Sequence, residues 1–248
     1  MVNCGVMLKA ITFDLWKTLV IYSDPEQKAR RKRLRAEGML NRLISFGYSV
    51  SLGEVTNAYE CSGEGIEEFR KNLRELDTKT QLVYFLKCLG IDKHNKELLS
   101  ALEKPYAEAS LIEMPLLVES VKETINAIKN MKYKIGLISN VGRTPGRVVR
   151  VYLRNYNLLD EFDAVSFSDE IGFRKPHEKT FLETLSKLRV SANEAMHVGD
   201  DLYADIYGAK KVGMKTCLLG LGTRIYCNVE PDFVISELKK LKKILSSK

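Results

Sequence analysis

The sequence lacks the segments that mark membrane and secreted proteins. No apolar run approaches the roughly 18–20 residues that a membrane span needs. Residues 1–16 do not combine a charged start, a long apolar stretch and a small-residue cleavage site, so they do not resemble a secretory signal. We therefore expect a cytoplasmic protein.

Cysteine and histidine are also few. The five cysteines include no CxxC pair, and there are only three histidines. This pattern argues against a disulfide framework and against a structural zinc site. We expect the cysteines to be buried or incidental thiols in a reducing compartment.

What is present indicates a folded globular chain with a basic surface. Of its 248 residues, 45% are hydrophobic and 29% are charged, and the net charge is +7. Such a balance is unlike that of disordered chains, and it favours anionic ligands without identifying nucleic acid, which we consider an improbable partner. The densest basic run, residues 28–35, is expected to form the solvent-exposed face of a helix; the alternative is an anion-attracting patch.

The chain divides into two kinds of sequence. Residues 8–13 form a short apolar run typical of a buried strand, and residues 24–104 have helical periodicity with almost no strand signal. Ser51-Leu-Gly-Glu54 is a capping box, and Asp77 is a second candidate helix cap. Within this helical region, Gly63 and Gly65 either form a specificity loop or interrupt a helix.

After residue 115, strands alternate with helices. Strands are predicted at 135–138, 162–167, 195–198, 215–219 and 233–235, with helices at 119–131, 144–157, 178–188, 204–212 and 238–245. This alternation predicts a Rossmann-like α/β core with a parallel sheet. We assign residues 1–20 and 115–248 to the core and residues 21–114 to an inserted helical-bundle cap domain.

Polar side chains follow four of the predicted strands. They are Asp14 through Thr18, then Ser139-Asn140, then the loop that carries Lys175-Pro176, and finally Gly199-Asp200-Asp201 through Asp205. Ligands of open α/β sheets bind at the carboxyl ends of the strands. A carboxylate nucleophile, a shared Mg²⁺, a hydroxyl and a lysine together suit phosphoryl transfer.

The order and spacing of these groups resemble those of the haloacid dehalogenase superfamily. The matching motifs are Phe13-Asp14-x-x-x-Thr18, Ser139-Asn140, Lys175-Pro176 and Gly199-Asp200-x-x-x-x-Asp205. The resemblance covers essentially the whole chain. The helical insertion lies where one branch of that family has its cap.

The resemblance implies a role for each matched residue. Asp14 would be the nucleophile that forms an aspartyl-phosphate, with Lys175 stabilising the transferring group. Mg²⁺ would be held by Asp14, Asp200 and the backbone carbonyl of Trp16. Asp201 and Asp205 would support the metal, Ser139 and the Asn140 backbone would bind the phosphoryl group, and Thr18 would order the nucleophile loop.

Trp16 departs from the family pattern. Most phosphatases of this superfamily have an aspartate at this position that protonates the leaving oxygen and then activates water. Tryptophan cannot transfer protons, and losing general acid–base catalysis typically costs ~10²–10⁴-fold in rate. The candidate substitutes are Asp24, Asp201, His177 and a carboxylate of the cap.

Three interpretations follow from this departure. The favoured one is a phosphatase of a small phosphomonoester; the others are a metal-independent 2-haloacid dehalogenase, and a binding or regulatory protein with a dormant site. Asp200 and Asp201 beside Asp14 would repel a substrate carboxylate unless a cation offsets them, which favours Mg²⁺ and a phosphate. His197 is expected to be a hydrogen-bonded strand histidine without a catalytic role.

Overall fold

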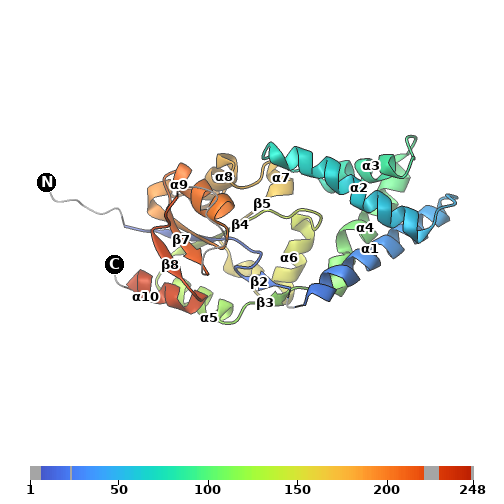
Figure 1. The fold of residues 1–248 in the computed structure, drawn as a ribbon. Helices are drawn as coiled ribbons and strands as arrows, with labels where there is room; N and C mark the ends of the chain where they lie inside the picture. The colour runs from blue at the N-terminus through green and yellow to red at the C-terminus, as the bar shows by residue number, and fades with distance from the viewer. Residues whose placement is uncertain (1–6, 23, 221–228, 247–248) are drawn as a thin grey trace.

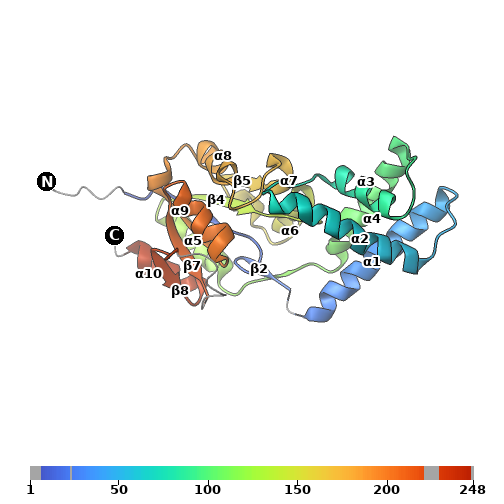
Figure 2. The ribbon, with the colours of Figure 1, turned by 45° about the horizontal axis from the view of Figure 1, so that its top comes forward.

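The computed structural model describes residues 7–22, 24–220 and 229–246. An α/β core and a lobe of four helices within residues 25–112 lie next to each other along the long axis of the molecule (Figures 1 and 2). In the described part of the chain, no helix is long and apolar enough to cross a membrane.

A six-stranded sheet forms the centre of the core. Its strand order is β5-β4-β1-β6-β7-β8, and every neighbouring pair is parallel, which confirms the expected sheet. The strands are β1 (Ala10–Phe13), β4 (Lys134–Ser139), β5 (Ala164–Phe167), β6 (Ala195–Gly199), β7 (Lys215–Leu219) and β8 (Phe233–Ile235). Because β1 lies between β4 and β6, the segments that follow these three strands meet at one edge.

Helices cover both faces of this sheet. Helices α5 (Val121–Asn130), α6 (Gly146–Asn155) and α10 (Leu241–Ser246) contribute to one apolar cluster with the strands. Helices α8 (Glu178–Leu188) and α9 (Gly208–Lys211) contribute to another. The buried strand residues therefore contact apolar side chains on both sides, as in parallel sheets generally.

The helical lobe has its own apolar centre. It consists of α1 (Pro25–Ser45), α2 (Leu52–Lys71), α3 (Thr78–Cys88) and α4 (Lys96–Ile112). Each helix begins at a residue whose side chain accepts a hydrogen bond from the first turn, and the capping box at Ser51 is present. Large buried side chains from all four helices pack together, among them Met39, Tyr59, Phe85 and Leu102.

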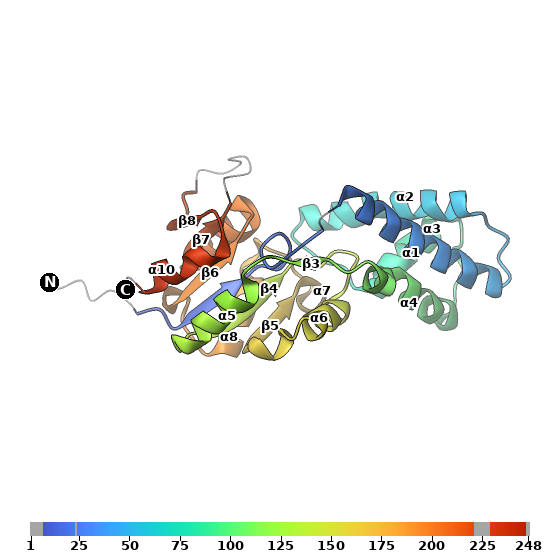
Figure 3. The same ribbon diagram turned by 90° about the horizontal axis from the view of Figure 1, so that it is seen from below.

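A short antiparallel ribbon joins the two regions. It pairs β2 (Val20–Ile21) with β3 (Leu116–Leu117), and these segments run between the core and α1–α4 (Figure 3). Strands of two residues are too short to show a hydrophobic period, so the sequence did not predict them.

The remaining helical segments are short. A π-helix (Leu202–Tyr207) precedes α9, which corrects the prediction of one α-helix over 204–212. The others are α7 (Ser168–Ile171) and 3₁₀ turns at Leu159–Glu161, Ala192–Glu194 and Leu238–Lys240. Gly63 and Gly65 lie inside α2, so they form neither a loop nor a helix break.

The cysteines differ from expectation. Cys61 and Cys88 form a disulfide between α2 and α3, so the prediction of free thiols is wrong for this pair. Their partnership depends on the packing of two helices, which spacing along the chain does not reveal. Cys217 is free and buried as expected, and Cys4 and Cys227 lie outside the described residues.

Candidate active site

The candidate site lies where β1, β4 and β6 end. Asp14 follows β1 directly, and its backbone N–H donates to the carbonyl of Val198 in β6 at 2.9 Å. Ser139 is the last residue of β4, and Asp200 follows β6. The topology therefore brings three separately predicted motifs to one edge of the sheet.

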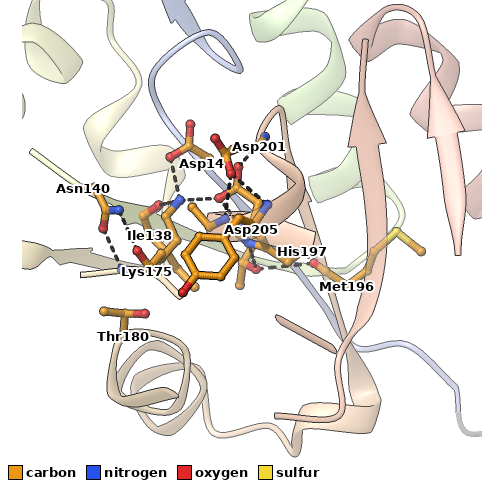
Figure 4. Close-up of polar contacts among 12 residues, drawn as sticks. Asp14, Ile138, Asn140, Lys175, Thr180, Met196, His197, Asp201 and Asp205 are labelled. Carbon is orange, nitrogen blue, oxygen red and sulfur yellow. Dashed lines mark hydrogen bonds and ion pairs between the residues drawn. The ribbon is translucent and has the colours of Figure 1, made fainter. Parts of the chain in front are cut away.

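Lys175 is the centre of the polar network. Its Nζ donates to Asp14 Oδ1 and Asp205 Oδ1, both at 2.6 Å, and to the backbone carbonyl of Ile138 at 2.8 Å (Figure 4). The ammonium group has three protons, so these acceptors satisfy it fully. Only 3% of Lys175 is exposed, which makes this a buried charge held between two carboxylates.

The loop that carries Lys175 is held by Asn140. The Asn140 side-chain oxygen accepts from the Lys175 backbone N–H at 2.8 Å, and its amide donates to the Lys175 carbonyl at 3.1 Å. This double contact fixes the lysine backbone beside the end of β4. The side chain of Asn140 is therefore a positioning group, and only its backbone remains for the substrate contact implied by the sequence.

Asp205 is held by a second set of contacts. Its Oδ2 accepts from the Asp201 backbone N–H at 3.0 Å, and its Oδ1 contacts His197 Nε2 at 3.2 Å. A Cβ at Gly199 would lie 2.3 Å from Asp205 Cγ, so this approach requires glycine. The expectation of a hydrogen-bonded His197 is confirmed, since Thr12 also contacts its Nδ1 at 2.8 Å.

Burial and charge set the protonation of these groups. Burial raises the pKa of Asp14 to about 7, against the opposing effect of Lys175. Burial and the charge of Asp205 raise the pKa of Asp200 to about 6. Burial also opposes ionisation of Asp205, but Lys175 and His197 outweigh it and hold the pKa of Asp205 well below its usual range.

Three carboxylates can converge on one ion. Single oxygen atoms of Asp14, Asp200 and Asp205 all lie within 4.8 Å of one another. Carboxylate oxygens are the ligands that Mg²⁺ prefers in proteins. Asp14 and Asp205 share the single positive charge of Lys175, and Asp200 lies 3.8 Å from the exposed Lys17, so negative charge remains and a divalent cation fits the donor set.

Two hydroxyls near this edge lack protein partners. Within the described ranges, the buried Oγ of Ser139 and the buried Oγ1 of Thr18 have no hydrogen-bond partner. Buried hydroxyls are normally paired, so each has capacity for an additional acceptor or donor. This agrees with the substrate-binding role that the sequence implies for Ser139.

Several candidates are engaged elsewhere. The Asp201 carboxylate caps the π-helix by accepting from the N–H groups of Tyr203 and Ala204. Asp24 caps α1 and pairs with Arg30, and His177 caps α8. These contacts describe local structural roles for all three side chains.

Trp16 packs against two tyrosine rings. Its ring stacks on Tyr22 with centroids 5.6 Å apart and meets Tyr152 edge-on at 6.4 Å. It also lines a cavity of about 820 Å³ that α1 and α2 share with the core loop after β4. Glu60 and Glu67 are the carboxylates in the lining of this cavity.

The cavity holds functional candidates that sequence reasoning missed. The segment 28–35 was expected to be a solvent-exposed helix face, but Arg35 is buried, and Arg31 and Arg35 line the cavity. Arg70 and Arg143 line it too. The density of the basic run was the available signal, but helical periodicity alone does not show which of its faces meets the core.

The helical lobe also contacts the loop that carries Lys175. The backbones of Arg74 and Phe173 form an antiparallel β-bridge, and the Glu75 N–H donates to the Gly172 carbonyl at 3.1 Å. The buried Glu75 carboxylate accepts from Ser168 at 3.1 Å and pairs with Arg70 and Arg174. The position of Lys175 thus depends on contacts from both regions.

Known proteins resemble this chain over most of its length. The family described as haloacid dehalogenase-like hydrolase matches residues 8–213. A glyceraldehyde 3-phosphate phosphatase of Pyrococcus furiosus is 31% identical over 248 aligned positions, which cover 96% of this chain and 93% of the relative.

Two solved structures share the fold over nearly the whole chain. A HAD phosphatase from Thermococcus onnurineus has a TM-score of 0.64 at 27% identity, covering 97% of this chain and 99% of its own. A 2-haloacid dehalogenase from Pseudomonas syringae has a TM-score of 0.73 at 22% identity with the same coverage, which shows the fold alone.

Proposed function

This chain belongs to the haloacid dehalogenase-like hydrolases and is a phosphatase of that family; we propose that it hydrolyses a small phosphomonoester through an aspartyl-phosphate on Asp14, with Mg²⁺ as cofactor. The observation that carries this proposal is the pair of 2.6 Å contacts by which Lys175 joins Asp14 to Asp205 at the sheet edge. The names of its relatives support a small phosphate ester as substrate.

Asp14 is the proposed nucleophile. Lys175 binds its Oδ1, and this contact orients the carboxylate so that Oδ2 is the oxygen that attacks phosphorus. Attack requires the ionised form, which burial disfavours and Lys175 favours. The bond between phosphorus and the ester oxygen breaks, and the released alkoxide takes a proton from solvent. Water then hydrolyses the acyl phosphate and regenerates the Asp14 carboxylate.

The proposed metal ligands are Asp14, Asp200 and the backbone carbonyl of Trp16. A bound Mg²⁺ would neutralise charge on the phosphoryl oxygens and on the carboxylates. We assign Asp205 a supporting role, because Lys175, His197 and the Asp201 N–H already occupy its oxygens. Asp201 supports the metal end through this backbone contact.

The proposed phosphoryl contacts come from Ser139 and the Asn140 backbone, and Lys175 stabilises the transferring group through its charge. The unpaired Ser139 hydroxyl supplies a donor at the end of β4, and Lys175 supplies positive charge. Thr18 is proposed to order the nucleophile loop from its buried position. With the Asn140 side chain fixing the lysine loop, these groups need little reorganisation when substrate binds.

The lack of a proton donor for the leaving group at position 16 distinguishes this site from that of an Asp-x-Asp phosphatase. Trp16 supplies no proton, so we propose that turnover depends steeply on the acidity of the leaving alcohol. Glu60 and Glu67 in the cavity lining give the cap-carboxylate alternative concrete candidates. The dehalogenase alternative would need no such proton, but the cluster of Asp14, Asp200 and Asp205 disfavours a haloacid carboxylate.

The test is release of p-nitrophenol from p-nitrophenyl phosphate, with Mg²⁺ and with a chelator. Its acidic leaving group makes it least sensitive to a missing general acid. We expect metal-dependent turnover that Asp14→Asn reduces by on the order of 10³-fold or more, while the exposed Asp92→Asn leaves it unchanged.

Two outcomes would contradict the proposal. Turnover no higher than that of Asp14→Asn would exclude a phosphatase with this nucleophile. Halide release from a 2-haloacid in the presence of chelator would support the dehalogenase instead.

A further inference from the structure

The cavity under the helical lobe is strongly cationic. Six lysine and arginine side chains line it, against the two carboxylates Glu60 and Glu67. Trp16 and Val141 also line it, and they follow the nucleophile and Ser139 by two residues each. The loops that follow β1 and β4 therefore form part of the cavity wall, together with arginines of the cap.

Three of these arginines have buried nitrogen atoms that form no hydrogen bond within the described part of the chain. Among the residues that the structure describes, Arg31 Nε, Arg70 Nη2 and Arg143 Nη1 are buried and have no hydrogen-bond partner. Guanidinium nitrogens only donate, and nearly all buried donors in proteins are paired. Each nitrogen can therefore donate a hydrogen bond to an acceptor from outside the chain.

The arginine side chains are fixed by their other contacts. The Arg143 guanidinium lies 3.7 Å from the Tyr59 ring centroid and donates through Nη2 to the Tyr59 carbonyl at 2.9 Å. Arg31 lies 3.5 Å above the Tyr22 ring, and Arg70 Nε pairs with the buried Glu75 at 3.2 Å. The unpaired nitrogens belong to groups that are already oriented.

Gly63 leaves space for the Arg143 side chain. A Cβ at this position of α2 would lie 2.8 Å from Arg143 Nη2, so glycine lets the core arginine reach the helix. Arg143 comes from the loop after β4, while Arg31 and Arg70 come from α1 and α2. The arrangement exists only because the cap and the core meet here.

We propose that this cavity binds a second anionic group of the substrate, a carboxylate or a second phosphate, through Arg31, Arg70 and Arg143. The proposal rests on the proposed function, and it narrows the substrate to a phosphomonoester with a negative charge at each end. Guanidinium groups bind both anions with charge-assisted hydrogen bonds, so the two sources share one chemistry.

Matched pairs of esters test this proposal. One pair is 3-phosphoglycerate and glycerol 3-phosphate, which share a carbon skeleton and differ by a carboxylate. The other is the bisphosphate and the monophosphate of 1,3-propanediol. We expect kcat/KM for the doubly anionic member of at least one pair to exceed that of its partner by at least ~10-fold, the value of one charge-assisted contact.

Substitutions assign that preference to the arginines. We expect Arg143→Met and Arg31→Met each to lower the preference by about tenfold, chiefly through KM, and Arg143→Lys to restore part of it. The control Arg154→Met changes an exposed arginine on α6 and should leave the preference as it is. A thermal melt of each variant identifies any that fails to fold. Because Arg31 and Arg143 are changed separately, each substitution is an independent test.

The outcomes separate the two proposals. Equal turnover of both members of each pair by the wild type would overturn the second-anion site and leave the phosphatase intact. A preference that survives all the arginine substitutions would also overturn it. If the wild type hydrolysed none of these esters and no p-nitrophenyl phosphate, the proposed function and this inference would both be overturned.

Discussion

In the core, Lys175 lies between Asp14 and Asp205 with both contacts at 2.6 Å, whereas in the cavity three arginines each keep a buried nitrogen without a partner. The first cluster is nearly complete in itself and requires only a cation to balance its carboxylates. The second is incomplete until an anion arrives. A site for a constant chemical step can be built in advance, while a site that selects the substrate must leave contacts open.

The largest effect is expected at Lys175. Lys175→Met would leave two buried carboxylates without their cation, which should lower the free energy of unfolding by about 3–5 kcal/mol in the presence of chelator. It should also abolish turnover, because the pKa of Asp14 would rise further without the lysine. Urea denaturation and the p-nitrophenyl phosphate assay measure the two effects.

Lys17→Met is the matched control. Lys17 lies 3.8 Å from Asp200, but its side chain is 77% exposed, so the change should lower stability by less than about 1 kcal/mol. Equal effects of the two substitutions would contradict the view that the core cluster depends on a buried charge balance.

Glu75 tests the contact between the two regions. Its buried carboxylate pairs with Arg70 and Arg174 and accepts from Ser168. Glu75→Gln should lower the free energy of unfolding by about 2–3 kcal/mol, because it leaves buried positive charge uncompensated. It should also raise KM for the doubly anionic esters, since Arg70 would lose the partner that orients it.

The control for this change is Glu67→Gln, measured by the same denaturation experiment. Glu67 pairs with Arg70 at 3.4 Å from a position that is 62% exposed, so we expect a change below about 0.5 kcal/mol. If Glu75→Gln were as mild as Glu67→Gln, the buried pairings would not hold the two regions together.

The smallest expected effect concerns Asp169. Both of its oxygens accept from the Gly146 N–H at the start of α6, and burial raises its pKa to about 6. The folded state therefore binds more protons than the unfolded state between that value and an unfolded pKa of about 3.9. Stability contributed by this group must rise as pH falls from 7 towards 5.

Asp169→Asn keeps an acceptor for Gly146 and removes the titration. We expect wild type to gain about 1 kcal/mol or less relative to this variant over that pH interval, after allowance for solvent screening. Denaturant unfolding of both proteins at each pH measures the difference. A gain of the opposite sign would show that Asp169 is stabilised as a carboxylate, like Asp205.

The sequence was a better guide to the strands and their motifs than to contacts between distant segments. Each polar motif follows a short apolar strand, and parallel strands present their carboxyl ends at one edge, so the proximity of Asp14, Ser139 and Asp200 was predictable. The ribbon of β2 and β3, the Cys61–Cys88 disulfide and the π-helix at Leu202–Tyr207 were not. Each depends on pairing or packing between segments, and none leaves a periodic signal.

Trp16 has one property that follows from its identity in the sequence and others that only the fold shows. Its identity alone excludes proton transfer from the side chain at position 16, because the indole ring has no group that titrates near neutral pH. Its contacts with Tyr22 and Tyr152, and its place in the cavity lining, are properties of the fold.

The sequence by itself determined the α/β core, the helical insertion and the residue types of the reaction centre, because local hydrophobic periods and strand-end positions encode them. Only the tertiary structure decided that Arg31 and Arg35 line a cavity and that Arg143, from the loop after β4, lines the same cavity. A helix of 21 residues can present its basic side chains to water or to a neighbouring surface. The choice depends on packing against distant segments, and Gly63 and Tyr59 provide that packing here.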